Sequence, residues 1–349
     1  MITMKDIARL ANTSLGTVDR ALNNKPGVSE RTKKNILKIA ESLNYSPNKH
    51  GKALVIKKQN IKLGIILEPQ QNPYFQELKK GIQLACDELQ AYGITAHILS
   101  MNSYSEAEQL QLMDQLHDLE VSGIVMNAIN SDAISQKIDA FVAQGIKIVT
   151  CNTDNPNSKR SCFVGFENET SGRVAAELLS KFVGNTGDFL VVIGFPYIMA
   201  HHDRQKGFVD KISEDFSDIH ISSIIESNEQ NEIAFERTLL ALEQNPKING
   251  IYIAGFGVEG VANALKTKNL QQKIHVLCHD YTPLTGILVR ENIVDAIICQ
   301  DAVHHGYSAL KILSELIIDN KEPQHKTYMT SVEIRLKENI CTNNQNWEL

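Results

Sequence analysis

The sequence predicts an α/β protein: a small all-α helix-turn-helix head followed by two lobes, each built on a doubly wound parallel sheet. Three observations support this. The chain has 349 residues, 42% of them hydrophobic, which is enough for several separate cores. Residues 1–58 hold twelve lysines and arginines against four acids, whereas the remainder holds 23 against 37, a balance of −14. From residue 61, short apolar runs alternate with segments of helical period.

The charge asymmetry bears on function. A basic head on an acidic body is expected when only the head meets a polyanion such as DNA. A solvated, lysine-rich helix face would give the same balance, so charge alone leaves both interpretations open.

Three amphipathic segments predict the helices of the head. Residues 4–11 carry apolar side chains on one face, and a second helix follows Ser14, a suitable N-cap, and ends before residues 23–27. A third helix is capped by Ser29 and ends near residues 44–47. Two short helices joined by a tight turn form a helix-turn-helix, whose second helix is free to enter the major groove of DNA.

Strands and helices alternate through the body. The first lobe is predicted to contain strand 61–67, helix 74–92, strand 95–99, helix 105–119, strand 123–126, helix 132–144 and strand 147–150. The second is predicted to contain helix 170–183, strand 189–193, helix 203–213, strand 219–225, helix 230–243, strand 250–254, helix 257–267 and strand 274–278.

These elements predict the domain boundaries. We expect the head over residues 1–46, a hinge helix and linker over 47–60, a two-lobed domain over 61–335 and a tail over 336–349. The first lobe is expected to hold about 61–165 with a return near 285–310, and the second about 166–284 with 311–335.

Polar and aromatic side chains gather where the predicted strands end, in the segments 70–75, 150–154, 202–208, 279–281 and 299–301. Ligands of doubly wound sheets bind at the carboxyl ends of the strands, and two facing lobes form a cleft. Carboxylates such as Asp154, amides and one arginine beside aromatic rings suit a polyhydroxylated sugar. Any one of these residues could simply cap a helix, but five converging segments favour a binding site.

The head resembles that of LacI/GalR-type bacterial regulators. The resemblance rests on Thr3-x-x-Asp6-Ile7-Ala8, Ser14-x-x-Thr17-Val18-x-Arg20-Ala21-Leu22-Asn23, Val28-Ser29-x-x-Thr32 and Leu43-Asn44-Tyr45-x-Pro47-Asn48. It implies that Leu15, Gly16 and Arg20 face the bases, with Arg20 able to bind guanine O6 and N7, worth about 1–3 kcal/mol of discrimination. Phosphate-facing positions are implied for Thr3, Ser14, Thr17, Asn23, Ser29, Thr32, Tyr45 and Asn48.

The resemblance also implies a hinge helix over residues 47–54 that orders on DNA and inserts Leu54 into the minor groove. Two residues depart from the family pattern. Asp19 replaces the usual serine, and a carboxylate near phosphate costs affinity unless it pairs with a base such as Arg20 or Arg9. Gly51 replaces the usual alanine, at a cost of about 1 kcal/mol of helix propensity.

Residues from about 61 to 320 resemble periplasmic sugar-binding proteins of the ribose-binding type, which LacI-type regulators carry behind the head. By position, the implied ligand residues are Asn72, Tyr74, Phe75, Asn152, Arg204, Phe256, Asp280 and Gln300. Asn152, Thr153 and Phe256 differ in type from the residues of ribose binders, which leaves the sugar open. The resemblance implies a homodimeric, sugar-responsive regulator, a repressor by family default, that binds double-stranded DNA at a near-palindromic operator.

One alternative comes from another motif. Gly255, Gly257 and Gly260 follow a predicted strand, open a helix and precede Asp280 by about twenty residues, which is the spacing of a dinucleotide-binding fingerprint. A redox sensor or dehydrogenase that binds a nicotinamide dinucleotide is therefore the second hypothesis. Against it, the motif lies in the middle of the second lobe and Asp280 already has a place in the sugar motif.

The sequence also argues against an enzyme, a metal-binding protein and a membrane protein. No G-x-S-x-G or H-E-x-x-H motif occurs, so we expect no enzyme, cofactor or metal site, and the histidine pairs at 201–202 and 304–305 point to different sides of their elements. No run of about 18 apolar residues occurs, which predicts a cytoplasmic protein without a membrane span. Reduced structural thiols are expected for the scattered cysteines Cys86, Cys151, Cys162, Cys278, Cys299 and Cys341.

Overall fold

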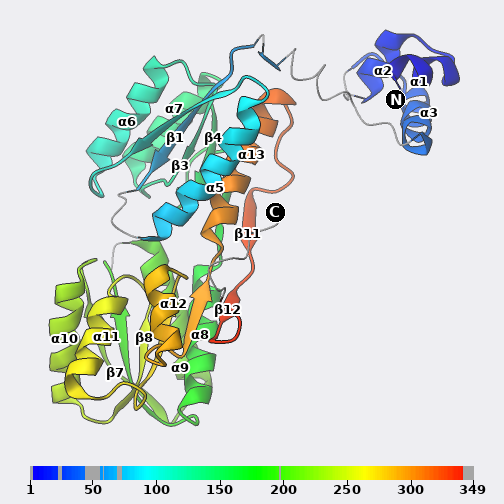
Figure 1. Ribbon diagram of the computed structural model, residues 1–349. Helices are drawn as coiled ribbons and strands as arrows, with labels where there is room; N and C mark the ends of the chain where they lie inside the picture. Colours follow the sequence, from blue (N-terminus) through cyan, green and yellow to red (C-terminus); the bar gives the residue numbers. More distant parts are fainter. Residues whose placement is uncertain are drawn as a thin grey trace. The chain divides into compact units, whose positions relative to one another are not determined.

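Figure 1 shows the computed structural model of the chain. The structure describes residues 3–22, 26–43, 56–57, 59–68, 73–195 and 198–340. The chain forms two compact units, one of residues 1–61 with 88–95 and the other of residues 62–87 with 96–349. No helix among the described residues is long and apolar enough to cross a membrane.

The head consists of α1 (Met4–Leu10), α2 (Leu15–Leu22) and α3 (Glu30–Ser42), which confirms the three predicted helices. Its small core includes Ile7, Val18 and Ile36, none of which has exposed surface. Each helix begins at a hydroxyl side chain that accepts a backbone N–H from the first turn, as predicted for Ser14 and Ser29.

The first lobe contains a six-stranded sheet in the order β11-β5-β4-β3-β1-β2. Its strands are β1 (Lys62–Leu67), β2 (Thr95–Ser100), β3 (Gly123–Met126), β4 (Lys147–Cys151), β5 (Cys162–Phe166) and β11 (Thr327–Thr330). Helices α6 (Glu106–Asp118) and α7 (Asp132–Ala143) pack on one face. On the other face α5 (Pro73–Gln90) lies beside α13 (Ala302–Ile318) in Figure 1, and an added Cβ at Gly81 would lie 1.9 Å from the Val303 carbonyl oxygen.

The second lobe contains a six-stranded sheet in the order β12-β10-β9-β8-β6-β7. Its strands are β6 (Gly187–Ile193), β7 (Ile219–Glu226), β8 (Ile248–Ile253), β9 (His275–His279), β10 (Ala296–Cys299) and β12 (Glu333–Arg335). Helices α8 (Asn168–Phe182) and α9 (Met199–Asp215) cover one face, where Phe208 stacks on Tyr252. Helices α10 (Asn231–Gln244), α11 (Val258–Lys268) and α12 (Pro283–Arg290) cover the other.

The predicted assignment of the return segments to lobes is wrong. Within 285–310, which was assigned to the first lobe, most of α12 and all of β10 belong to the second lobe. Within 311–335, which was assigned to the second lobe, the rest of α13 and β11 belong to the first, and only β12 joins the second sheet. The physical reason is that α13 buries Leu310 and Leu313 against the first sheet, so the chain must cross before this helix and again after β11.

Candidate DNA-binding face and ligand cleft

The outer face of α2 carries the residues predicted to meet bases. Val18 and Ala21 point into the head, whereas Leu15, Gly16 and Arg20 are exposed. A Cβ added to Gly16 would lie 4.0 Å from Nη1 of Arg20, so the guanidinium lies along the same face as the glycine. This face therefore combines an apolar side chain, an open backbone position and a bidentate donor, a set suited to a major groove.

The described residues with a predicted phosphate contact all lie at helix N-termini. Thr3 and Asp6 form a capping box at α1. The hydroxyls of Ser14 and Thr17, and of Ser29 and Thr32, are 2.8 Å apart in each pair at the starts of α2 and α3. Free N–H groups and the positive dipole end at such termini favour anions. The predicted contacts Asn23, Tyr45, Asn48 and Leu54 lie outside the described residues.

A cleft between the lobes of the body brings together most of the predicted ligand residues. Tyr74, Phe75 and Asn152 line it from the first lobe, Arg204 and Asp280 from the second, and Gln300 from a crossing between them. The lining also includes Glu68, Tyr104, Thr153, Ile198, Ala200, His201 and Glu229. These side chains lie at or beyond the carboxyl ends of strands, as expected for doubly wound sheets. Asn72 lies outside the described residues.

Three cleft residues that follow strands adopt left-handed backbone conformations. Their φ angles are 62° at Asn152, 56° at Glu229 and 67° at Asp280. Residues other than glycine rarely adopt this region, and such strain, of order 1–3 kcal/mol for each residue, clusters at ligand sites. The turn after each strand thus directs a polar side chain into the cleft.

Arg204 is held from two sides. Its Nε donates to Asn168 Oδ1 at 2.9 Å, and its Nη1 donates to the Ala254 carbonyl at 3.1 Å. A Cβ at Gly172 of α8 would lie 2.0 Å from the Arg204 carbonyl oxygen, so close helix packing sets the backbone position of this residue. Burial raises the pKa of Asp280, whereas the guanidinium of Arg204 and a hydrogen bond from Gln300 act in the opposite direction.

Two glutamates in the cleft were missed by the sequence analysis. Burial raises the pKa of Glu68, at the end of β1, to about 7, although the hydroxyls of Tyr104 and Thr153 donate to its carboxylate. Burial also raises the pKa of Glu229, which follows β7, to about 7. Each is an acid that closely follows a strand, a signal that was available in the sequence.

A chain of hydrogen bonds connects the cleft to the crossings between lobes. The Tyr74 hydroxyl lies 3.1 Å from His305 Nδ1, and His305 Nε2 lies 2.7 Å from the Thr330 hydroxyl. Thr330 in turn donates to the Gln300 carbonyl at 3.1 Å. Burial lowers the pKa of His305 to about 3, so the ring is neutral. Because the Thr330 hydroxyl donates to Gln300, Nε2–H of His305 donates to Thr330 and Nδ1 accepts from Tyr74. These bonds join Tyr74 to two of the segments that cross between the lobes.

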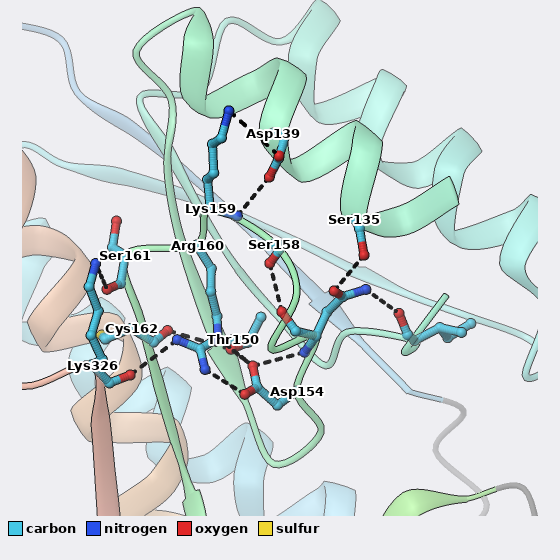
Figure 2. A network of polar contacts seen from close by, with 12 residues as sticks. Ser135, Asp139, Thr150, Asp154, Ser158, Lys159, Arg160, Ser161, Cys162 and Lys326 are labelled. Atoms are coloured by element: carbon cyan, nitrogen blue, oxygen red, sulfur yellow. Dashed lines mark hydrogen bonds and ion pairs between the residues drawn. The ribbon is translucent and has the colours of Figure 1, made fainter. Parts of the chain in front are cut away.

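The predicted ligand residue Asp154 lies elsewhere. Figure 2 shows its carboxylate between Arg160 and Thr150, and Arg160 engages both of its oxygens. The side chain of Asp154 is 14% exposed and that of Arg160 is 8% exposed. Arg160 also donates to the Lys326 carbonyl at 3.1 Å. This pair fixes the loop between β4 and β5, which presents Asn152 and Thr153 to the cleft. Asp154 is therefore a positioning residue for the loop.

Phe256 and the glycine motif are also absent from the cleft lining. The Phe256 carbonyl accepts a hydrogen bond from Ser227 at 2.7 Å. An added Cβ at Gly260 would lie 2.1 Å from the Asn231 carbonyl, and one at Gly255 would lie 2.7 Å from the Gly194 nitrogen. Gly257 has a φ of 118° at the start of α11. Close packing and one special backbone angle account for all three glycines, so the dinucleotide alternative gains no support.

Comparisons with known proteins cover both parts of the chain. Residues 63–322 match the family described as periplasmic binding protein domain, and residues 3–48 match the family described as bacterial regulatory proteins, lacI family. The chain is 27% identical to the probable HTH-type transcriptional repressor ExuR of Bacillus subtilis over 78% of each chain. It is 23% identical to catabolite control protein A of Priestia megaterium, over 92% of this chain and 93% of the relative. The ribose operon repressor of Halalkalibacterium halodurans is 24% identical over 83% of each chain.

Solved structures resemble the body. The XylFII molecule matches with a TM-score of 0.70 and 26% identity, covering 80% of this chain and 99% of that one. GanP, a glucose-galactose binding protein from Geobacillus stearothermophilus, matches with a TM-score of 0.72 and 23% identity, covering 80% and 98%. These likenesses confirm the predicted two-lobed architecture.

Proposed function

We propose that a small sugar bound between the lobes controls the affinity of this chain for DNA, from the premise that its body belongs to the periplasmic binding protein domain family and its head matches the lacI family of bacterial regulatory proteins. The observation that carries the proposal is the convergence of Tyr74, Asn152, Arg204 and Asp280 from two lobes on one cleft. Acids, amides and a guanidinium beside aromatic rings match sugar hydroxyls and the C–H face of a sugar ring. The relative named ribose operon repressor is consistent with this chemistry.

The proposed mechanism is a shift between two states of a homodimer. Sugar binding favours the closed arrangement of the lobes, which changes how the paired hinges order on a near-palindromic operator. A difference of about 1–3 kcal/mol in sugar affinity between the states is sufficient for control. Repression is the activity that the relatives' names support for the DNA-bound state.

The binding proposal is tested first by thermal shift. A ligand at about 100 times its Kd stabilises the folded protein by about 2.7 kcal/mol. We expect a shift with one sugar among pentoses, hexoses, disaccharides and sugar phosphates, and a change in operator binding with the same sugar. A shift with NAD(H) alone would contradict the proposal and revive the glycine motif at Gly255–Gly260.

Arg20→Ala is expected to relax base preference at one symmetric position of the operator. Arg20 lies exposed on α2, and loss of a bidentate contact to guanine removes about 1–3 kcal/mol of discrimination at that position. Binding to operators selected from random DNA and then varied one base at a time measures this. Lys38→Ala, on an exposed position of α3, is the control for charge loss alone. Equal weakening on all sequences would make Arg20 a phosphate contact instead.

A further inference from the structure

The charges of the cleft do not balance. Three carboxyl groups line it, those of Glu68, Glu229 and Asp280, and Arg204 is the permanent cation among the described lining residues. The guanidinium of Arg204 acts to lower the pKa of both Asp280 and Glu229, but the larger effect of burial raises both pKa values. The His201 ring lies 3.9 Å from Glu229, but burial lowers the pKa of this histidine to about 3, so the ring carries no charge near pH 7. Three carboxyl groups thus share one permanent cation among the described lining residues of the cleft.

These two glutamates come from different lobes. Glu68 follows β1 in the first lobe and Glu229 follows β7 in the second, and the charge of Glu229 raises the pKa of Glu68. Oε1 of Glu229 is buried without a hydrogen-bond partner among the described residues. Two carboxylates that line the same cleft from opposite lobes repel when both are charged, and this repulsion opposes closure of the lobes unless a proton or a cation enters the cleft.

We propose that the ligand of this cleft carries a protonated amine on a polyhydroxylated body, the chemistry of an amino sugar. The inference rests on the proposed function and specifies its ligand. An ammonium group between the two glutamates turns their repulsion into two attractions that join the lobes. The rings of Tyr74, Phe75 and Tyr104 line the same cleft and add a surface that favours both C–H groups and a cation. No group of three metal-binding side chains occurs among the described residues, which favours an organic cation over a metal ion.

The charge balance also predicts a proton movement. Near pH 7 the glutamates are partly protonated in the free protein, since both pKa values are about 7. The groups around them are the hydroxyls of Tyr104 and Thr153 at Glu68, and the Phe256 N–H with the charges of Arg204 and Asp280 at Glu229. When the ammonium binds, the carboxyl O–H bond breaks and the proton passes to the buffer. Calorimetric titration in two buffers of different ionisation enthalpy measures this release.

The test compares matched sugars on the full-length protein. Glucosamine, galactosamine and mannosamine are titrated beside their parent hexoses, their N-acetyl forms, uronates and hexose 6-phosphates. We expect one amino sugar to bind at least about tenfold tighter than its parent hexose, with proton release. Glu229→Gln is expected to remove this preference, and Glu68→Gln provides the same test from the other lobe. Glu232→Gln, an exposed glutamate on α10, is the matched control and should leave the preference unchanged.

The outcomes separate the inference from the proposed function. A neutral sugar that binds as tightly as its amino form, and that changes operator binding, would overturn the inference and leave the proposed function intact. Preferred binding of a uronate or a phosphate would overturn it as well. If no sugar of any charge binds or changes operator binding, the proposed function itself is wrong.

Discussion

Arg204→Ala abolishes the response of operator binding to ligand, in our expectation, while operator binding by the free protein stays within about twofold of the original. Arg204 is 4% exposed and lines the cleft with Asp280. Removing one partner of a buried, charge-assisted hydrogen bond costs about 2–5 kcal/mol of affinity. That corresponds to a loss of about 30-fold to several thousandfold in Kd. Ligand titration and operator binding on the same preparation measure both effects.

Two companion variants make this result interpretable. Arg204→Lys keeps the charge but loses the planar fork, so we expect it to retain part of the affinity. Arg237→Ala removes an arginine of α10 that donates to the Glu226 carbonyl outside the cleft, and it should leave the ligand response intact. Because Arg204 also donates to Asn168 and to Ala254, thermal melting must show that the variant is folded. An unchanged ligand response in folded Arg204→Ala would move the binding site elsewhere.

Local pattern was sufficient to predict most of the helices and strands. The head helices, α5 to α11 and the strands β1 to β4 and β6 to β9 all occur within a few residues of their predicted positions. The helices α12 and α13 were not predicted, and the missed strands β5, β10, β11 and β12 have three to five residues each. Such short segments owe their conformation to pairing with neighbours, as β11 does with β5, and this pairing is not encoded locally.

The sequence predicted which segments reach the cleft more successfully than it predicted what each side chain does there. The cleft is lined by Tyr74, Phe75, Arg204 and Asp280. Each of them follows a strand of a parallel sheet, so its place at the cleft can be predicted from the order of strands and helices in the sequence. Asp154 satisfies the same rule, yet its carboxylate bonds to Arg160, six residues away, instead of lining the cleft. Whether an acid that follows a strand lines the cleft depends on which cation lies within its reach, and only the folded chain determines that.

Arg160→Met should destabilise the protein more than any surface change, by about 3–5 kcal/mol, because it leaves the buried carboxylate of Asp154 without its cation. Thr150 and the Asn155 N–H still donate to Asp154, but neither neutralises its charge. The variant also loses the bond to the Lys326 carbonyl, which ties the loop to the segment leading into β11. Chemical denaturation measured with a probe of the body reports the loss, and ligand affinity should fall as Asn152 and Thr153 lose their support.

A second, more exposed ion pair serves to test whether burial causes the expected loss of stability in Arg160→Met. Arg173 pairs with Glu214, again a guanidinium with a carboxylate, but the side chain of Arg173 is 34% exposed and that of Glu214 is 51% exposed. Arg173→Met should therefore lower the free energy of unfolding by at most about 1 kcal/mol. Replacing both buried partners, as Arg160→Met with Asp154→Leu, removes the stranded charge and should recover most of the stability. If the double variant is as unstable as the single one, the hydrogen bonds of the loop rather than its charge balance hold Asn152 and Thr153 at the cleft.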